Sequence, residues 1–249
     1  MAGRRRCGSV WDRADACART LGRLDRAPCS PGTGDRGRQA VKRLPRVKVC
    51  GLTRQADARA ALEVGAQGLG FVAAAESPRA LKATQVAAIC AGLPGDIERI
   101  GVFVDSSPDE VADFARVAGL SAIQLCGAEQ PGDYSEFHLP ILRRLPADEH
   151  GAAELELWRG LAWGFVIDHP GSAGGSGQRV DLELARSLAQ AAPCLLAGGL
   201  DESNVAEAIR RVEPSGVDAS SRLELSAGHK DRERVRDFVA RALAEWEIK

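Results

Sequence analysis

The sequence predicts a (β/α)8 barrel, an α/β fold of a single domain, preceded by a disordered N-terminal extension. From residue 47 onward, short β-rich segments alternate with segments of helical periodicity, and eight β-rich segments can be counted. A chain of 249 residues is also long enough for one barrel of this kind. A doubly wound sheet is the alternative, but that fold usually stops at about five or six strands.

A charge boundary near Pro45 separates the extension from the barrel. Residues 1–46 carry 11 Arg and 1 Lys against 4 Asp, a net charge of +8, whereas the other 203 residues carry 21 basic and 30 acidic side chains, a net charge of −9. The first part has no sustained apolar period and includes the turn-rich segment PCSPGTGDRGRQ. We therefore assign residues 1–45 to a basic, disordered extension and residues 46–249 to the barrel.

Composition argues against several classes of partner and cellular setting. Trp11 is the only aromatic residue of the extension and four Asp interrupt its positive charge, which is a poor pattern for binding nucleic acid. No apolar run reaches the length of a membrane span, about 18 residues, or of a signal-peptide core. The seven cysteines form no C-x-x-C pair and are odd in number. We expect a cytoplasmic protein that binds neither nucleic acid nor membrane.

The eight predicted strands follow one another at intervals typical of parallel βαβ units. They are residues 46–50 (RVKVC), 68–72 (GLGFV), 99–104 (RIGVFV), 121–127 (SAIQLCG), 139–145 (LPILRRL), 162–168 (AWGFVID), 193–199 (PCLLAGG) and 216–221 (GVDASS).

Helices are predicted between these strands from apolar residues at helical spacing. The helix after the third strand has the clearest start, because Ser107 as N-cap, Pro108 at the first helical position and Glu110 form a capping box. The other predicted apolar faces lie within residues 58–65, 185–192, 205–212 and, in the closing helix, 235–242.

The residues that end the strands are candidates for the active site, which in such barrels lies at the C-terminal ends of the strands. Cys50 ends the first strand and Asp168 the sixth, so a thiol and a carboxylate face the barrel mouth and are suited to acid–base chemistry. Gly51 lets the chain turn without covering the thiol. Taken alone, Cys50 is better explained as a buried structural cysteine, and Asp168 equally well as a helix cap or turn residue.

Three loops after the last three strands offer backbone N–H groups and hydroxyls to an anion. They are PGSAGGSGQ (170–178), AGGLDESN (197–204) and DASS (218–221). Any one of them is readily explained as a turn, but three on adjacent units favour a phosphate site.

Eight motifs resemble, in order and spacing, those of phosphoribosylanthranilate isomerase of tryptophan biosynthesis: KVCGLTR, GLGFV with SPR, GVFVD, IQLCG, GGSG, LAGGL, GVDASS and GHKD. The resemblance runs from about residue 47 to the end, in agreement with the charge boundary. It implies an Amadori rearrangement of N-(5-phosphoribosyl)anthranilate to 1-(2-carboxyphenylamino)-1-deoxyribulose 5-phosphate, with no cofactor and no metal.

The resemblance also implies roles for individual residues. Asp168 would be the general acid that protonates the ribose ring oxygen, Cys50 the general base that takes the C2 proton, and Arg79 the partner of the anthranilate carboxylate. The further residues implied to bind this small phosphorylated substrate are Gln124, Gly174, Gly175, Ser176, Gly177, Gly198, Gly199, Asp218, Ser220 and Ser221. The oligomeric state is left open by the sequence, and a monomer is favoured because no apolar docking face is evident.

Three positions depart from the family pattern. Cys126 replaces the His of a Gln-Leu-His-Gly motif, Arg222 replaces a Gly after the two serines, and His169 directly follows the expected acid. Two other functions remain as alternatives: a barrel that binds a sugar phosphate without turnover, and an indole-glycerol-phosphate synthase. The first has no need of both Cys50 and Asp168, and the second needs a strand-end Lys, for which Lys48 is the only candidate.

Overall fold

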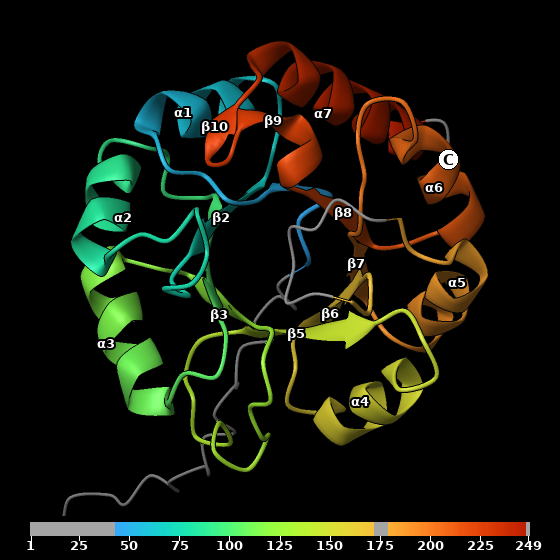
Figure 1. Cartoon of the computed structure of the whole chain (residues 1–249), viewed down its shortest axis with the longest axis horizontal. Helices are drawn as coiled ribbons and strands as arrows, with labels where there is room; N and C mark the ends of the chain where they lie inside the picture. Colours follow the sequence, from blue (N-terminus) through green and yellow to red (C-terminus); the bar gives the residue numbers. More distant parts are fainter. Residues whose placement is uncertain (1–42, 172–178, 248–249) are drawn as a thin grey trace, which may run out of the picture. The chain divides into compact units, whose positions relative to one another are not determined.

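Eight parallel strands in sequential order close into a barrel, with β1 pairing both β2 and β8 (Figure 1). The structure is a computed structural model that describes residues 43–171 and 179–247. The prediction of a (β/α)8 barrel is confirmed. Most of the predicted extension, and Gly174, Gly175, Ser176 and Gly177 of the predicted phosphate site, lie outside the described residues.

The strands of the barrel match the predicted segments to within a few residues. They are β1 (Val47–Val49), β2 (Gly68–Val72), β3 (Glu98–Phe103), β4 (Ala122–Leu125), β5 (Ile141–Pro146), β6 (Gly164–Asp168), β7 (Cys194–Leu196) and β8 (Gly216–Ala219).

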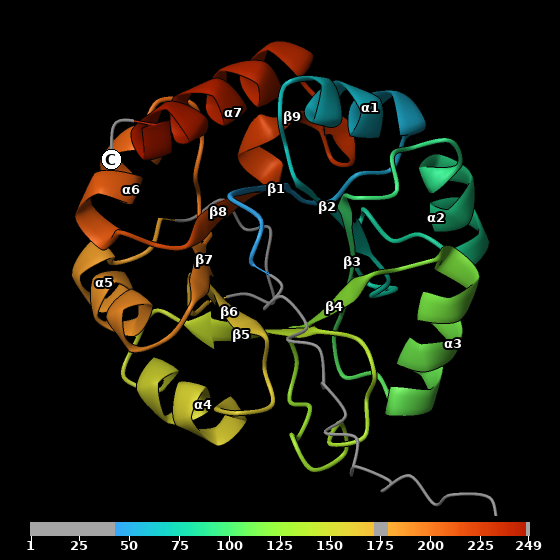
Figure 2. The ribbon, with the colours of Figure 1, turned by 180° about the vertical axis from the view of Figure 1, so that it is seen from behind.

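Helices surround the barrel on the outside, as the view from behind also shows (Figure 2). They are α1 (Gln55–Glu63), α2 (Ala83–Cys90), α3 (Pro108–Ala118), α4 (Gly151–Trp158), α5 (Leu182–Ala191), α6 (Val205–Val212) and α7 (Arg232–Glu247).

The capping box predicted for α3 is present. The Ser107 hydroxyl accepts a hydrogen bond from the backbone N–H of Glu110, and the Glu110 carboxylate accepts one from the backbone N–H of Ser107. Pro108 occupies the first turn, and Gly119 ends the helix with a left-handed φ of 66°. The local sequence therefore determines both ends of this helix.

Apolar residues pack on both sides of the barrel wall, and polar side chains are buried with them. Most buried apolar residues lie between the strands and the helices, in one continuous cluster. A second cluster occupies the barrel interior and includes Ile100, Leu142, Val166 and Leu195. Polar side chains that are also buried, among them Lys48, lie on strands of the same barrel. Charge inside the barrel needs partners there, since an unpaired buried ion is costly.

The connection from β4 to β5 has turns but no helix, unlike the predicted rhythm. Arg143 of β5 holds it: the guanidinium donates to Glu129 Oε2 at 2.7 Å and to the carbonyl oxygen of Gly127 at 2.6 Å. Tyr134 of the same connection donates its hydroxyl to the carbonyl oxygen of Ser106 at 2.7 Å. Buried hydrogen bonds thus replace a helix in shaping this connection.

A two-stranded hairpin of β9 (Glu224–Ser226) and β10 (His229–Lys230) follows a short 3-10 helix, η1 (Ser221–Leu223). This hairpin is not predicted from the sequence, because strands of three and two residues are too short to show an alternation of apolar and polar residues. The hairpin lies near α1 and α7 (Figure 1). Thr53, in the loop before α1, donates its hydroxyl to the carbonyl oxygen of Gly228 in the hairpin.

The chain joins the barrel slightly before the boundary drawn from charge. Leu44 packs against the interior apolar cluster, and Pro45 is buried beside Gly68 of β2 and Gly216 of β8. These two apolar residues cover the N-terminal ends of the strands, a role that the charge pattern does not reveal.

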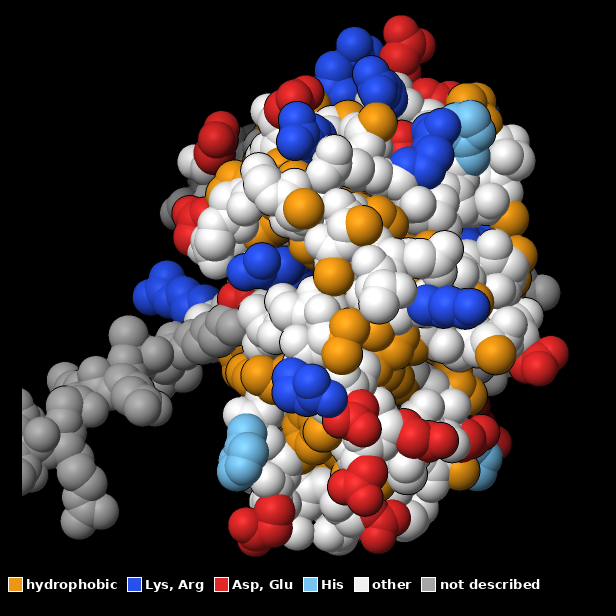
Figure 3. All heavy atoms as spheres, turned by 90° about the vertical axis from the view of Figure 1, so that its left-hand side faces the viewer, with side chains coloured by type: hydrophobic (Ala, Val, Ile, Leu, Met, Phe, Trp, Pro, Cys, Tyr) orange, Lys and Arg blue, Asp and Glu red, His pale blue; other side chains and the backbone are white. Residues whose placement is uncertain are grey.

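Side chains of both charges occur on the side of the barrel that carries α2 and α3, among many uncharged ones (Figure 3). Among the described residues no helix is both long and apolar enough to cross a bilayer.

The capping box should contribute measurably to stability. We expect Ser107→Ala to lower the free energy of unfolding by about 1 kcal/mol, because the N–H of Glu110 loses its acceptor. Urea denaturation measures this change. As a control, Ser135→Ala removes a hydroxyl bonded only to the carbonyl oxygen of Gly132 and should change stability by less than about 0.5 kcal/mol. Equal effects of the two substitutions would contradict the capping role.

Candidate active site

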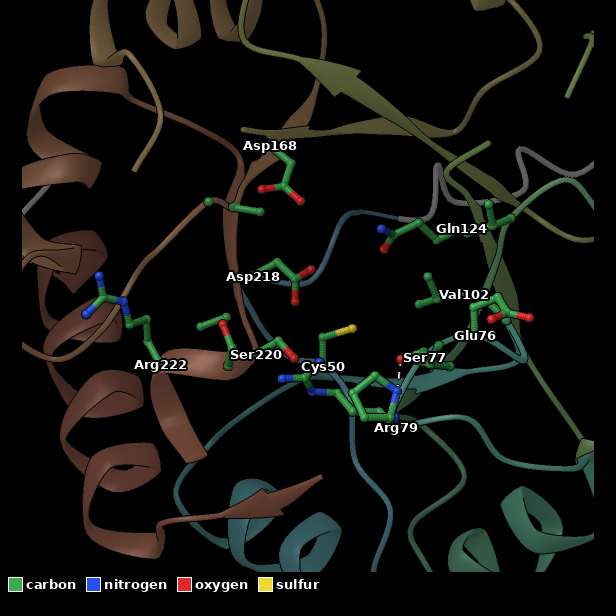
Figure 4. A pocket seen from close by; sticks show the side chains of 18 of the residues that line it. Cys50, Glu76, Ser77, Arg79, Val102, Gln124, Asp168, Asp218, Ser220 and Arg222 are labelled. Carbon is green, nitrogen blue, oxygen red and sulfur yellow. Dashed lines mark hydrogen bonds between the residues drawn. The ribbon is translucent and has the colours of Figure 1, made fainter. Parts of the chain in front are cut away.

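A cavity of 810 Å³ opens at the C-terminal ends of the strands, and it is lined by most of the residues that the sequence singled out. The described candidates that line it are Cys50, Arg79, Gln124, Asp168, Gly198, Gly199, Asp218, Ser220 and Ser221. The topology thus brings together residues that lie in or just after β1, β4, β6, β7 and β8 and in the loop after β2. In the close-up, Cys50 and Asp168 point into the same space from different sides (Figure 4).

Cys50 follows β1 and is 9% exposed. The neighbouring strand makes room for its thiol, because a Cβ atom on Gly70 would lie 2.6 Å from the Cys50 sulfur. Burial raises the pKa of Cys50, while the positive charges of Lys48 and Lys230 oppose that rise. Cys50 is therefore mainly in its protonated, thiol form, and the two nearby cations make its ionisation to the thiolate easier.

Lys48 lies in β1, two residues before Cys50 and therefore on the same face of the strand, and it is fully buried. Its ammonium group donates to Asp218 Oδ2 at 2.7 Å and to Gln124 Oε1 at 3.0 Å. Burial lowers the pKa of Lys48, but the charges of Asp218 and Cys50 raise it by more, so the lysine is charged. Because Lys48 does not line the cavity, it is not placed like the catalytic strand-end Lys that a synthase would need.

Asp218 has one oxygen in this ion pair and one without a partner. Its Oδ1 is buried and has no hydrogen-bond partner among the described residues, and its side chain lines the cavity. A buried acceptor of this kind is costly unless something binds to it. The cavity therefore presents an acceptor suited to a hydroxyl group.

Asp168 ends β6 on another side of the cavity. Its Oδ1 accepts a hydrogen bond from the backbone N–H of His169 at 2.8 Å. Burial raises the pKa of Asp168, and the N–H of His169 and the charge of Arg144 reduce the rise. A raised pKa favours a protonated carboxyl group, the form in which it can act as an acid.

Arg79 lies in the loop after β2 and makes a two-point ion pair. Its Nε and Nη2 donate to the two oxygens of Glu224 at 2.9 and 2.7 Å. Lys230 donates to the same carboxylate at 2.7 Å. Arg79 is predicted from the sequence as a binding residue and Lys230 belongs to the motif GHKD, whereas no role is predicted for Glu224. A lone Glu outside the strand ends gave no signal before the fold was known.

The loops expected to bind phosphate follow β7 and β8, and Ser220 of the second loop lies close to Arg79. Gly198 and Gly199 follow β7 with φ values of 80° and 65°, and Ser220 and Ser221 follow β8. Arg222 lies beyond Ser220 as seen from Cys50 (Figure 4). Hydroxyls, backbone and a cation thus gather at one end of the cavity, which suits an anion.

Cys126, the departure from the family His, does not line the cavity. Gln124 donates its amide N–H to the Cys126 sulfur at 3.2 Å, and burial raises the pKa of Cys126 to about 12. With its carbonyl on Lys48 and its amide on Cys126, the Gln124 side chain is held at both ends by protein. No group of three or more His, Cys, Asp or Glu side chains within the described ranges could hold a metal ion.

Comparison with known proteins decides the family. The model of the family described as N-(5'phosphoribosyl)anthranilate (PRA) isomerase matches residues 47–241. The chain belongs to this family. A relative from Synechococcus sp. (strain JA-2-3B'a(2-13)), named N-(5'-phosphoribosyl)anthranilate isomerase, is 37% identical over 215 residues, which cover 81% of this chain and 92% of the relative.

Two solved structures of PRA isomerases are similar to the whole barrel. One, of monomers of the dimeric enzyme from Thermotoga maritima, is 29% identical with a TM-score of 0.72 and covers 81% of this chain and 100% of its own. The other, of a PRA isomerase in complex with reduced 1-(o-carboxyphenylamino)-1-deoxyribulose 5-phosphate, is also 29% identical, with a TM-score of 0.70 and the same coverage. The prediction of a PRA isomerase of tryptophan biosynthesis is confirmed.

Gly51 should be needed for the placement of Arg79. Its φ is 72°, and a Cβ atom there would lie 2.6 Å from Arg79 Cδ and 2.7 Å from Ser220 Oγ. We expect Gly51→Ala to displace Arg79 and raise KM by about tenfold or more, as the loss of a charged contact does.

Gly119→Ala is the matched control. Gly119 has a similar φ of 66°, but a Cβ atom there would meet open space. Gly119→Ala should cost about 1 kcal/mol of stability from backbone strain alone, and Gly51→Ala should cost more because its Cβ atom also clashes; only Gly51→Ala should raise KM. Steady-state kinetics and thermal denaturation separate the two effects. An unchanged KM in Gly51→Ala would mean that substrate binding does not depend on the close approach of Gly51 to Arg79.

Proposed function

We propose that the chain isomerises N-(5-phosphoribosyl)anthranilate with Asp168 as general acid and Cys50 as general base. The observation that carries the proposal is the placement of a carboxyl group and a thiol on different sides of one cavity (Figure 4). A barrel that only bound the sugar phosphate would have no use for this opposed pair.

In the first step, the Asp168 carboxyl group donates its proton to the ring oxygen of the ribose. The bond between this oxygen and C1 breaks, and the electron pair of the anthranilate nitrogen forms a Schiff base. The raised pKa of Asp168 supports this role because it increases the protonated fraction near neutral pH.

In the second step, the Cys50 thiolate removes the proton from C2, and the electrons of that bond form the enolamine. The enolamine then tautomerises to the aminoketone. Lys48 and Lys230 support the base because their charges counter the effect of burial on the pKa of Cys50.

Two groups of residues around the cavity are proposed to bind the two anionic groups of the substrate. Arg79 would hold the ring carboxylate, and the loops at Gly198–Gly199 and Ser220–Ser221, with Gly174–Gly177, would hold the phosphate. The free Oδ1 of Asp218 would accept a ribose hydroxyl, while Gln124 would border the sugar. The complex of a similar isomerase with a phosphorylated product analogue supports a ligand with these two anionic ends.

We also propose that the enzyme acts in the cytoplasm as a monomer. A base that must remain a free thiol is suited to a reducing compartment, and the four cysteines among the described residues are unpaired. A similar isomerase from Thermotoga maritima is dimeric, and light scattering of this enzyme should instead give the mass of a single chain.

Removal of the base should abolish most of the activity. We expect Cys50→Ala to lower kcat by at least about 100-fold, the usual effect of losing a general base, while the protein remains folded. A fluorescence assay that follows loss of the substrate measures this. The control is Cys90→Ala, which removes a buried thiol on α2 outside the cavity and should leave kcat unchanged. A Cys50→Ala enzyme within a few-fold of wild type would refute the assignment.

The acid should be visible in the pH dependence of kcat/KM. Burial raises the pKa of Asp168 above the ordinary value of a carboxyl group, and it raises the pKa of Cys50 above the ordinary, and higher, value of a thiol. Between the two pKa values, each tenfold gain in thiolate is offset by a tenfold loss of carboxylic acid. The wild-type profile should therefore be level in this range and fall on either side of it.

Asp168→Asn removes the titrating carboxyl group whose loss of protons offsets the gain of thiolate at Cys50. We expect its kcat/KM to be much lower and to rise about tenfold per pH unit up to the pKa of the thiol, because only the thiolate fraction then varies. Binding of the product analogue should persist, since the amide keeps the shape of the carboxyl group. A level profile in Asp168→Asn would show that another group is the acid.

A further inference from the structure

Three buried charged side chains meet at one side of the cavity, and the proposed mechanism gives no role to one of them, Glu224. Arg79, Glu224 and Lys230 have side chains that are 11%, 4% and 1% exposed. Glu224 accepts two hydrogen bonds from Arg79, at 2.9 and 2.7 Å, and one from Lys230, at 2.7 Å. We call this group the Arg79 triad.

Stability alone is a poor reason for such a group. Burying ions costs solvation energy, and apolar side chains of similar volume often stabilise a protein as well or better. Orientation is a stronger reason, because a two-point bond between a guanidinium and a carboxylate fixes the plane of the guanidinium. Glu224 uses Nε and Nη2 of Arg79. Within the described residues, Nη1 donates no hydrogen bond, so one edge of Arg79 remains available at the cavity.

Lys230 connects the Arg79 triad by hydrogen bonds to the end of β8 and to α1. Its ammonium group also donates to the carbonyl oxygen of Ser220 at 3.1 Å, next to the proposed phosphate loop. Its backbone N–H donates to Asp57 of α1 at 3.2 Å, and a two-point bond from Arg54 holds that carboxylate. The hairpin of β9 and β10 thus connects the loops after β1, β2 and β8. Figure 4 shows the Arg79 side chain extending toward Cys50 and Ser220.

We propose that Glu224 is a positioning residue that orients Arg79 for the carboxylate on the substrate's aromatic ring, and that Lys230 anchors Glu224 to the end of β8. This inference rests on the proposed function, in which Arg79 binds that carboxylate. Glu224 acts through Arg79 and does not touch the substrate. The triad therefore determines selectivity for a ring that bears a carboxylate, a property that the acid and base do not control.

The test compares two competitive inhibitors of the full-length enzyme. One is the reduced product analogue, and the other is the same molecule without its ring carboxylate. Wild type should prefer the first by about tenfold or more, as expected for a charged hydrogen bond. In Glu224→Gln most of this preference should disappear, because an amide offers a single acceptor to the two donors of Arg79. Inhibition by inorganic phosphate should not change.

Glu224→Asp is the conservative variant and should recover part of the preference, because it restores the charge. Glu154→Gln is the matched control: it removes an acid that pairs with Arg143 at 2.7 Å, away from the cavity, and should leave the preference intact. Thermal denaturation monitors folding of each variant. If Glu224→Gln does not fold, the double variant Glu224→Gln/Lys230→Met leaves no unpaired buried lysine and replaces it in the comparison.

The outcomes separate this inference from the proposed function. Loss of the preference in both Arg79→Met and Glu224→Gln supports the inference. Loss in Arg79→Met with full retention in Glu224→Gln overturns the positioning role and leaves the proposed function intact. Retention in Arg79→Met overturns the positioning role and also the proposed binding of the ring carboxylate by Arg79. Equal weakening of the two inhibitors in Glu224→Gln would mark a purely structural role and also overturn the inference.

Discussion

Closure of the barrel between its first and last strands is the constraint on which the site depends. β1 and β8 pair with Lys48 directly opposite Asp218, so the seam places an ammonium group and a carboxylate side by side inside the barrel. Both groups are buried, and each would be costly alone. Two positions further along these strands lie Cys50 and Ser220. The same pairing that closes the sheet thus brings the proposed base next to the proposed phosphate loop.

The cations around Cys50 show how the barrel balances two opposed effects on one thiol. Burial in the mouth disfavours the thiolate. Lys48 lies below the thiol and Lys230 acts from the hairpin, and both favour the charged form. Each cation has its own carboxylate partner, Asp218 or Glu224. The barrel can therefore keep positive charge near the base without leaving a buried ion unpaired.

The positions that depart from the family pattern are accommodated in different ways. Cys126 does not line the cavity, and its sulfur accepts a hydrogen bond from Gln124. The residue that replaces the family His is therefore bonded inside the barrel. His169 contributes its backbone N–H to Asp168, and its carbonyl oxygen accepts a hydrogen bond from Arg144. A backbone role of this kind does not depend on the imidazole. Arg222 lines the cavity at the end where the phosphate is expected.

The sequence by itself determined the strand order, the capped start of α3 and the residues at the strand ends, because alternation, caps and strand tips are local patterns. Cys50 and Asp168 could be selected on this basis, since parallel strands all present their C-terminal ends at one face. The tertiary structure decided what local patterns do not contain. The pairing of Lys48 with Asp218 joins residues 170 positions apart, and Glu224 meets Arg79 across 145 positions. Such contacts exist only once the barrel has closed, because closure brings the first two units of the chain against its last strand and hairpin.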